Sequence, residues 1–186
     1  MATQTRPGMF QALSNFQIVR DRAATISENL INLRNESLQE LLSDFENTEH
    51  KLEFVKTIEG VDFVNDSRAT NTNAVWFAME TMNQPIIWIT NMNRTELITE
   101  DLNQLIQEKV KIVVIQGVYN TVMENFFRSM NKEVYSVMDM EDAVRTAFYA
   151  GDNEGTVLFA PGVVSTGKYR TYRERGEKFK DAVAQL

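Results

Sequence analysis

The sequence has no cysteine and only one histidine, His50, in its 186 residues. Without thiols it can form neither a disulfide framework nor a thiolate metal site, a composition that suits the cytosol. A single histidine also argues against zinc sites and catalytic triads, which need more than this sequence offers. We therefore predict no metal ligand and no catalytic residue. We interpret His50, whose only ligand-type neighbour is Glu49, as an ordinary loop histidine.

Positive charge is also in short supply. The chain has 19 Lys and Arg against 26 Asp and Glu, with a net charge of −7 and a pI near 4.9. Nucleic-acid binding needs a concentrated basic face to neutralise phosphates, so this balance argues against a nucleic-acid partner. No apolar run is long enough to span a membrane, and the first residues lack the order of a secretory signal. We expect a cytoplasmic protein that binds neither nucleic acid nor membrane.

Length and composition predict one main domain. Hydrophobic residues make up 43% of the chain, which is ample for one buried core, but the chain is too short for two full domains. Residues 1–8 are predicted to be a flexible leader. Residues 9–48 carry apolar side chains at helical spacing and are predicted to form a helical extension. Residues 49–186 are predicted to form an α/β domain.

Apolar periodicity within this domain alternates between strand and helix spacing. Two alternating runs around Glu59-Gly60 predict a hairpin over 52–58 and 61–65. The later expected elements are a helix over 72–83, a strand over 85–90, a helix over 97–108, a strand over 110–115, a helix over 119–130, a strand over 133–137, a helix over 140–150, a strand over 155–160 and a helix over 169–186. This order predicts a Rossmann-like, mostly parallel sheet with a hairpin edge and helices on both faces. The sequence contains neither G-x-G-x-x-G nor G-x-x-x-x-G-K-[ST], so it lacks a dinucleotide fingerprint and a phosphate loop.

The first polar turn of this domain supplies the first candidate site residues. A strand ends at Asn65, a helix follows Asn71, and the residues between offer charged and hydroxyl groups: Asp66, Ser67, Arg68, Thr70 and Asn71. Ligands collect at the carboxyl ends of strands in open α/β sheets, and the free N–H groups of the following helix favour an anion. An alternative is that Ser67, Thr70 or Asn71 only caps the helix while Asp66 ends the strand.

Three polar loops follow strands on the same side of such a sheet. Each carries one cation: Arg68 in 65–71, Arg94 in 90–96 and Lys168 in 160–168. We expect these cations to converge into a site for a carboxylate or phosphate. The alternative is that they are solvated loop charges. Ser165 or Thr166, in the last of these loops, is expected to cap the last helix.

Three motifs, taken together, carry a family resemblance. They are His50-Lys51-Leu-Glu-Phe-Val, then Phe63-Val-Asn-Asp-Ser-Arg-Ala-Thr-Asn71, then Phe159-Ala-Pro161 followed by Ser165, Tyr169, Tyr172 and Arg175-Gly176-Glu-Lys-Phe179. Over about residues 36–186 the chain resembles the carboxy-terminal domain of Mur ligases, most closely that of the enzymes that add D-glutamate. The resemblance implies a Rossmann-like domain that closes over an ATP-binding central domain and helps to bind the incoming amino acid and the nucleotide.

The resemblance also implies roles for individual residues. Lys51, Asp66 and Asn71 fall at nucleotide-binding positions, with Asp66 on the aspartate that contacts the ribose. The positions that hold the amino-acid substrate are occupied by Arg68, Thr70, Arg94, Ser165 and Tyr172. Two departures stand out. Arginine replaces the family's lysine at positions 68 and 94, and Thr90-Asn91 replaces a glycine pair, so the chain gives up the close backbone approach that glycine allows.

The implied function is one part of an ATP-dependent amide ligase of peptidoglycan precursor synthesis. ATP and Mg²⁺ would be bound only through a central domain, and the partners would be the central and amino-terminal Mur ligase domains, in cis or in trans, together with a D-glutamate-like amino acid. The chain would be catalytically incomplete alone, because acyl-phosphate formation needs cradled phosphates and a placed metal. The alternative is a divergent binding or regulatory module that keeps the fold without catalysis.

Overall fold

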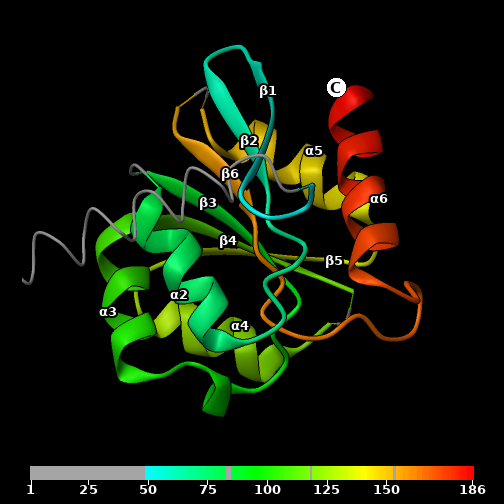
Figure 1. The fold of residues 1–186 in the computed structure, drawn as a ribbon. Helices are drawn as coiled ribbons and strands as arrows, with labels where there is room; N and C mark the ends of the chain where they lie inside the picture. Colours follow the sequence, from blue (N-terminus) through cyan, green and yellow to red (C-terminus); the bar gives the residue numbers. More distant parts are fainter. Residues whose placement is uncertain (1–48, 83–84, 118, 153) are drawn as a thin grey trace, which may run out of the picture. The chain divides into compact units, whose positions relative to one another are not determined.

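The computed structural model describes residues 49–82, 85–117, 119–152 and 154–186 (Figure 1). The predicted leader (1–8) and helical extension (9–48) lie outside these residues. The described strands are β1 (Glu53–Ile58), β2 (Val61–Asn65), β3 (Ile86–Thr90), β4 (Val110–Gln116), β5 (Glu133–Val137) and β6 (Thr156–Phe159). The helices are α2 (Thr72–Thr81), α3 (Glu100–Lys109), α4 (Thr121–Ser129), α5 (Met140–Ala150) and α6 (Tyr172–Ala184), with a 3₁₀ turn, η1, at Thr95–Leu97.

The strands form one six-stranded sheet in the order β1-β2-β6-β3-β4-β5. The pair β1 and β2 is an antiparallel hairpin at one edge, and all other neighbours are parallel. Glu59 and Gly60 both have positive φ, as the tight hairpin turn requires. The central strands β3 and β6 are buried along their whole length, which explains their continuous apolar sequences. The predicted α/β class and hairpin edge are confirmed.

Helices cover both faces of the sheet, as predicted (Figure 1). One core cluster joins the sheet to α2, α3 and α4, and a second joins it to α5 and α6. The connections from β2 to β5 run in one direction across the sheet, whereas the chain from β5 turns back to place β6 between β2 and β3. Right-handed crossovers in opposite directions put their helices on opposite faces. The ends of β2, β6 and β3 therefore surround a point where the connections diverge, which is where such folds bind ligands.

Two predicted helix starts are wrong by three residues. The helix α3 begins at Glu100 because Thr99 caps it, accepting a hydrogen bond from the N–H of Leu102. The helix α6 begins at Tyr172 because Thr171 accepts from the N–H of Glu174. The predicted caps Ser165 and Thr166 are therefore also wrong. Within the described part of the chain, no helix has both the length and the apolar character that a membrane crossing requires.

The fully buried Trp88 links β3 to the loop after β6. Its indole N–H donates to the carbonyl oxygen of Ala160 over 2.8 Å. One residue further, Pro161 accepts from the backbone N–H of Asn91 over 3.0 Å and from the hydroxyl of Thr90 over 3.3 Å. These bonds fix the start of the loop after β6 against the end of β3.

We predict that Trp88→Phe lowers the free energy of unfolding by about 1–3 kcal/mol, because the buried carbonyl of Ala160 loses its donor and a void forms. Urea denaturation would measure the change. As a control, Trp76→Phe replaces a tryptophan that is 37% exposed and should change stability by less than about 0.5 kcal/mol. Equal effects of the two substitutions would contradict this role of Trp88.

Candidate functional site

Three loops are joined at the carboxyl ends of β2, β6 and β3. The N–H of Asp66 donates to the carbonyl oxygen of Phe159 over 2.8 Å, so the loop after β2 starts against the end of β6. The N–H of Gly162 donates to the carbonyl oxygen of Ala69 over 2.8 Å. Gly162 has a φ of 74° and packs so closely on Met92 that an added Cβ would lie 2.3 Å from its side chain. The backbone of all three loops is therefore held in one continuous surface.

Four of the five predicted substrate residues line two neighbouring hollows on this surface. Thr70, Ser165 and Tyr172 line the first, which we call the Tyr172 pocket. Thr70 and Arg94 line the second, which we call the Arg94 pocket. Thr70 and Val164 contribute to both, so the two hollows share a wall. The topology thus brings these residues together, although they lie on three separate loops and at the start of α6.

The fifth predicted substrate residue, Arg68, lies beside the Tyr172 pocket. Its guanidinium carbon is 5.9 Å from the centre of the Tyr172 ring, a cation–π distance. Arg68 is exposed, and its backbone N–H donates to the carbonyl oxygen of His50 over 3.1 Å. The backbone at Arg68 is therefore fixed while its charged group faces solvent next to the ring.

The predicted nucleotide residues Asp66 and Lys51 lie close enough to influence each other. Burial raises the pKa of the Asp66 carboxyl to about 6, against the opposing effects of the Leu52 N–H and of the charges on Lys51 and Arg68. Burial also lowers the pKa of the Lys51 ammonium, with a further lowering by Arg68. Burial is thus the main influence on the charge of the Asp66 carboxyl, and the two cations partly offset it.

The third predicted nucleotide residue, Asn71, acts as a helix cap. Its side-chain oxygen accepts a hydrogen bond from the N–H of Ala74 over 3.0 Å at the start of α2. The capping alternative is therefore correct for Asn71. The residue also lines the Arg94 pocket, but its side-chain oxygen already has a partner there.

Lys168 does not join the other cations, and the predicted convergence is wrong for this residue. Its ammonium forms an ion pair with Asp139, the residue before α5. Lys168 lines a different hollow of about 360 Å³ beside Gln116 and Gly117 at the end of β4. The loop after β6 places Lys168 near the carboxyl end of β4, and there its ammonium lies next to the carboxylate of Asp139.

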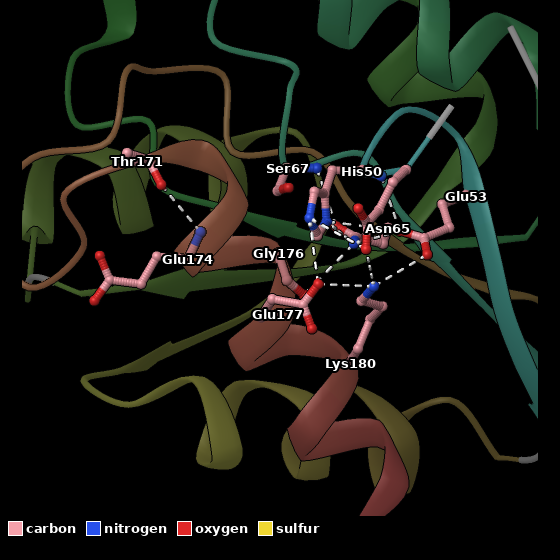
Figure 2. Close-up of polar contacts among 10 residues, drawn as sticks. His50, Glu53, Asn65, Ser67, Thr171, Glu174, Gly176, Glu177 and Lys180 are labelled. Carbon is pink, nitrogen blue, oxygen red and sulfur yellow. Dashed lines mark hydrogen bonds and ion pairs between the residues drawn. The ribbon is translucent and has the colours of Figure 1, made fainter. Parts of the chain in front are cut away.

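His50 lies in the turn before β1, as the loop interpretation expects, but it is buried. Its residue exposure is 1%, and its ring packs edge-on against Tyr172 with centroids 6.2 Å apart. The side-chain amide of Asn65 lies 3.0 Å from His50 Nδ1 and donates to Glu53 Oε2 over 3.0 Å (Figure 2). Because Asn65 Oδ1 accepts from the N–H of Ser67 over 3.1 Å, its NH₂ group must face the histidine. The only signal in the sequence was the place of His50 at the start of the first motif.

The helix α6 approaches this group through Gly176. A Cβ added at Gly176 would lie 2.3 Å from His50 Nδ1 and 2.4 Å from Ser67 Oγ, so no larger residue fits. The neighbouring Arg175 is buried, and its Nη2 donates to the carbonyl oxygens of Ser67 over 3.0 Å and Val163 over 3.1 Å. Burial lowers the pKa of the Arg175 guanidinium to about 10. Arg175 and Gly176 together hold two of the site loops against α6.

Glu49, His50 and Glu177 come close enough to suggest a metal site among the described residues. His50 Nε2 lies 3.4 Å from Glu177 Oε1 and 3.9 Å from Glu49 Oε1. However, Lys180 Nζ already lies 2.9 Å from both of those oxygens (Figure 2). The donation from Asn65 also makes Nδ1 the acceptor, so the proton of the neutral ring is on Nε2 and that atom has no lone pair for a metal. The group is better described as a carboxylate cluster neutralised by lysine.

Comparison with known proteins shows that the chain is similar to part of a group of ligases. No family model matches it. It is 35% identical over 165 residues to a UDP-N-acetylmuramoylalanine–D-glutamate ligase of Bacteroides fragilis, covering 88% of this chain and 37% of the relative. Enzymes of the same name from Christiangramia forsetii and Cytophaga hutchinsonii are 33% identical over 164 residues and 35% identical over 145 residues. The matches cover 37%, 37% and 32% of the three relatives, so the chain spans about a third of their length.

We predict that Gly176→Ala destabilises the protein by about 1–3 kcal/mol, because the new methyl group would overpack against His50 and Ser67. At an ordinary helix position the same change would stabilise by about 0.8–1 kcal/mol, so the sign of the effect is diagnostic. Chemical denaturation would measure it, with Lys178→Ala on the exposed part of α6 as control. A more stable Gly176→Ala variant would contradict the close approach.

We predict that Asp66 makes stability fall as pH rises from about 4 to about 6. The folded pKa of about 6 lies above the ordinary value of 3.8, so the folded state binds the extra proton in that window. The contribution of Asp66 to the free energy of unfolding is at most about 3 kcal/mol. It is fully present below the pKa of the unfolded state and is lost above the pKa of the folded state. Asp66→Asn should flatten the stability profile between these pH values, whereas Asp152→Asn, at an exposed position, should not. A profile that keeps its slope in Asp66→Asn would contradict the assignment.

Proposed function

We propose that this chain, a Mur ligase carboxy-terminal domain by its similarity to the D-glutamate-adding enzymes, binds the amino-acid substrate and covers the nucleotide in a Mur-type amide ligase. Such an enzyme joins UDP-MurNAc-L-alanine to D-glutamate with ATP hydrolysis, and we expect it to work in the cytoplasm. The observation that carries the proposal is the grouping of Thr70, Ser165 and Tyr172 around one hollow, with Arg68 beside it and Arg94 in the next.

The arginines support an anionic substrate. Arg68 and Arg94 are exposed, and neither forms an ion pair with a carboxylate in the described part of the chain. A guanidinium group can bind a carboxylate through two parallel hydrogen bonds, which lysine cannot do. In the proposed function Thr70 and Ser165 add hydroxyl groups to the same carboxylates. Ser165 Oγ has no hydrogen-bond partner among the described residues, but it is buried and would have to turn toward the carboxylate to bind it.

The residues suit only part of a nucleotide. Asp66 offers a carboxylate beside Lys51, an arrangement that fits a ribose hydroxyl and a nearby phosphate. The sequence lacks a glycine-rich phosphate loop, and the Glu49–His50–Glu177 group does not suit a metal ion. In the proposed function the central Mur ligase domain would hold the phosphates and Mg²⁺, which supply the chemistry of carboxylate activation. This chain would close over the ribose and present the amino acid.

A second candidate function is a binding or regulatory module without catalysis. The observation that favours it is the loop after β3, where the family's glycine pair is Thr90-Asn91. Asn91 Nδ2 donates to the backbone oxygen of Gln116 over 2.6 Å and to its side-chain oxygen over 2.5 Å. Thr90 Oγ1 accepts from the N–H of Met92 over 3.1 Å. Side chains thus occupy this loop where glycine would leave the backbone open to a ligand.

An NMR titration of the 186-residue chain with D-glutamate and, separately, with Mg²⁺-ADP distinguishes the two functions. The ligase proposal predicts shifts at residues 66–71, 94 and 165–172 with D-glutamate, and at Lys51 and Asp66 with the nucleotide. Well-dispersed spectra that do not respond to either ligand would contradict it and favour the binding module.

We predict that Arg68→Ala abolishes the response to D-glutamate while changing the free energy of unfolding by less than about 0.5 kcal/mol, since the side chain is exposed. Arg145→Ala is a matched control, because it removes an exposed arginine on α5. D-glutamate binding that is unchanged in Arg68→Ala would refute the substrate role of this residue. A large loss of stability would instead assign it a structural role.

A further inference from the structure

The described chain has unpaired arginines in addition to those to which the family resemblance gives a role. Arg170 and Arg173 are both exposed, and neither forms an ion pair with a carboxylate within the described ranges. Both line the Tyr172 pocket, and the guanidinium carbon of Arg173 lies 5.6 Å from the centre of the Tyr172 ring. Arg68 and Arg173 therefore flank the Tyr172 ring, and Arg170 lines the same pocket, in a protein whose net charge is −7.

The carboxylate nearest to these arginines in sequence, that of Glu174, already has a hydrogen-bond partner. Glu174 Oε2 accepts a hydrogen bond from the backbone N–H of Arg170 over 2.8 Å, not from its guanidinium group. The hydroxyl of Thr171 caps α6. The groups left to meet a ligand in the Tyr172 pocket are the guanidinium groups and the hydroxyls of Thr70 and Tyr172, with the buried hydroxyl of Ser165 beside them. All of them can donate a hydrogen bond, so the pocket suits an anionic oxygen.

The Arg94 pocket has a cation of its own. Arg94 lines it, while Arg170 and Arg173 line only the Tyr172 pocket. Thr70 and Val164 form the common wall. Two separate positive hollows divided by one wall fit a ligand with two anionic groups better than they fit a ligand with one.

We propose that Arg170 and Arg173 are specificity residues that, together with Arg68, hold one of two anionic groups of the ligand in the Tyr172 pocket, while Arg94 holds the other. The ligand class is an amino-acid dicarboxylate. This inference rests on the proposed function and adds two residues to its site.

The test is an amide-resolved NMR titration of the full chain with D-glutamate, comparing the original sequence with the double variant Arg170→Ala/Arg173→Ala. In the original chain, resonances of both pockets should shift. In the double variant the affinity should fall by about tenfold or more, since charge-assisted bonds to a carboxylate are lost. The shifts at Ser165 and Thr171 should disappear, while those at Asn93 and Arg94 persist at high ligand concentration.

The double variant Arg145→Ala/Lys178→Ala removes the same number of positive charges from exposed ion pairs on α5 and α6 and should bind D-glutamate within about twofold of the original chain. If D-glutamate binds but shifts only the Arg94 pocket, or if Arg170→Ala/Arg173→Ala matches this control, the inference is overturned and the proposed function stands. If D-glutamate fails to bind the original chain at all, the proposed ligand and this inference are both overturned.

Discussion

The close approach of α6 to the end of β2 at Gly176 is the contact on which the rest of the carboxyl edge depends (Figure 2). It encloses the His50 ring, whose Nδ1 faces Asn65, and brings Arg175 within reach of the loop carbonyl oxygens of Ser67 and Val163. Tyr172 lies one turn earlier on the same helix and packs against His50. The Tyr172 ring can therefore occupy its position at the proposed site because Gly176 has no side chain.

Clustered carboxylates lie on one side of this contact and arginines lie on the other. On one side the carboxylates of Glu49, Glu53 and Glu177 gather around Lys180, whose pKa is raised by their hydrogen bonds against the opposing effect of burial. On the other side Arg68 and Arg173, which flank Tyr172, form no ion pair with a carboxylate among the described residues. An acidic protein can in this way present a positive rim at one place, because its local field depends on nearby unpaired charges more than on net charge.

The sequence was sufficient for the elements and the fold class, because alternating and helical periodicities are local signals, and Glu59-Gly60 marks its own turn. It was not sufficient for contacts that depend on strand order. Arg94 and Lys168 looked equivalent as loop cations, yet Lys168 meets Asp139 because of where the loop after β6 runs. His50 looked ordinary because its partner Asn65 is 15 residues away and Gly176 is on another element. The family motifs identified the loops that form the candidate site. That Thr70 lines both pockets could be seen only in the folded structure.

We propose that the surface around Thr70 and Tyr172 binds an amino acid. Intermolecular nuclear Overhauser effects between D-glutamate and the isotope-labelled chain would test this, because they report proximity and not only a response to binding. We expect contacts from the ligand methylene protons to the Tyr172 ring and the Thr70 methyl group. Contacts confined to the hollow beside Gln116 and Lys168, or to residues at the opposite end of the strands, would contradict it.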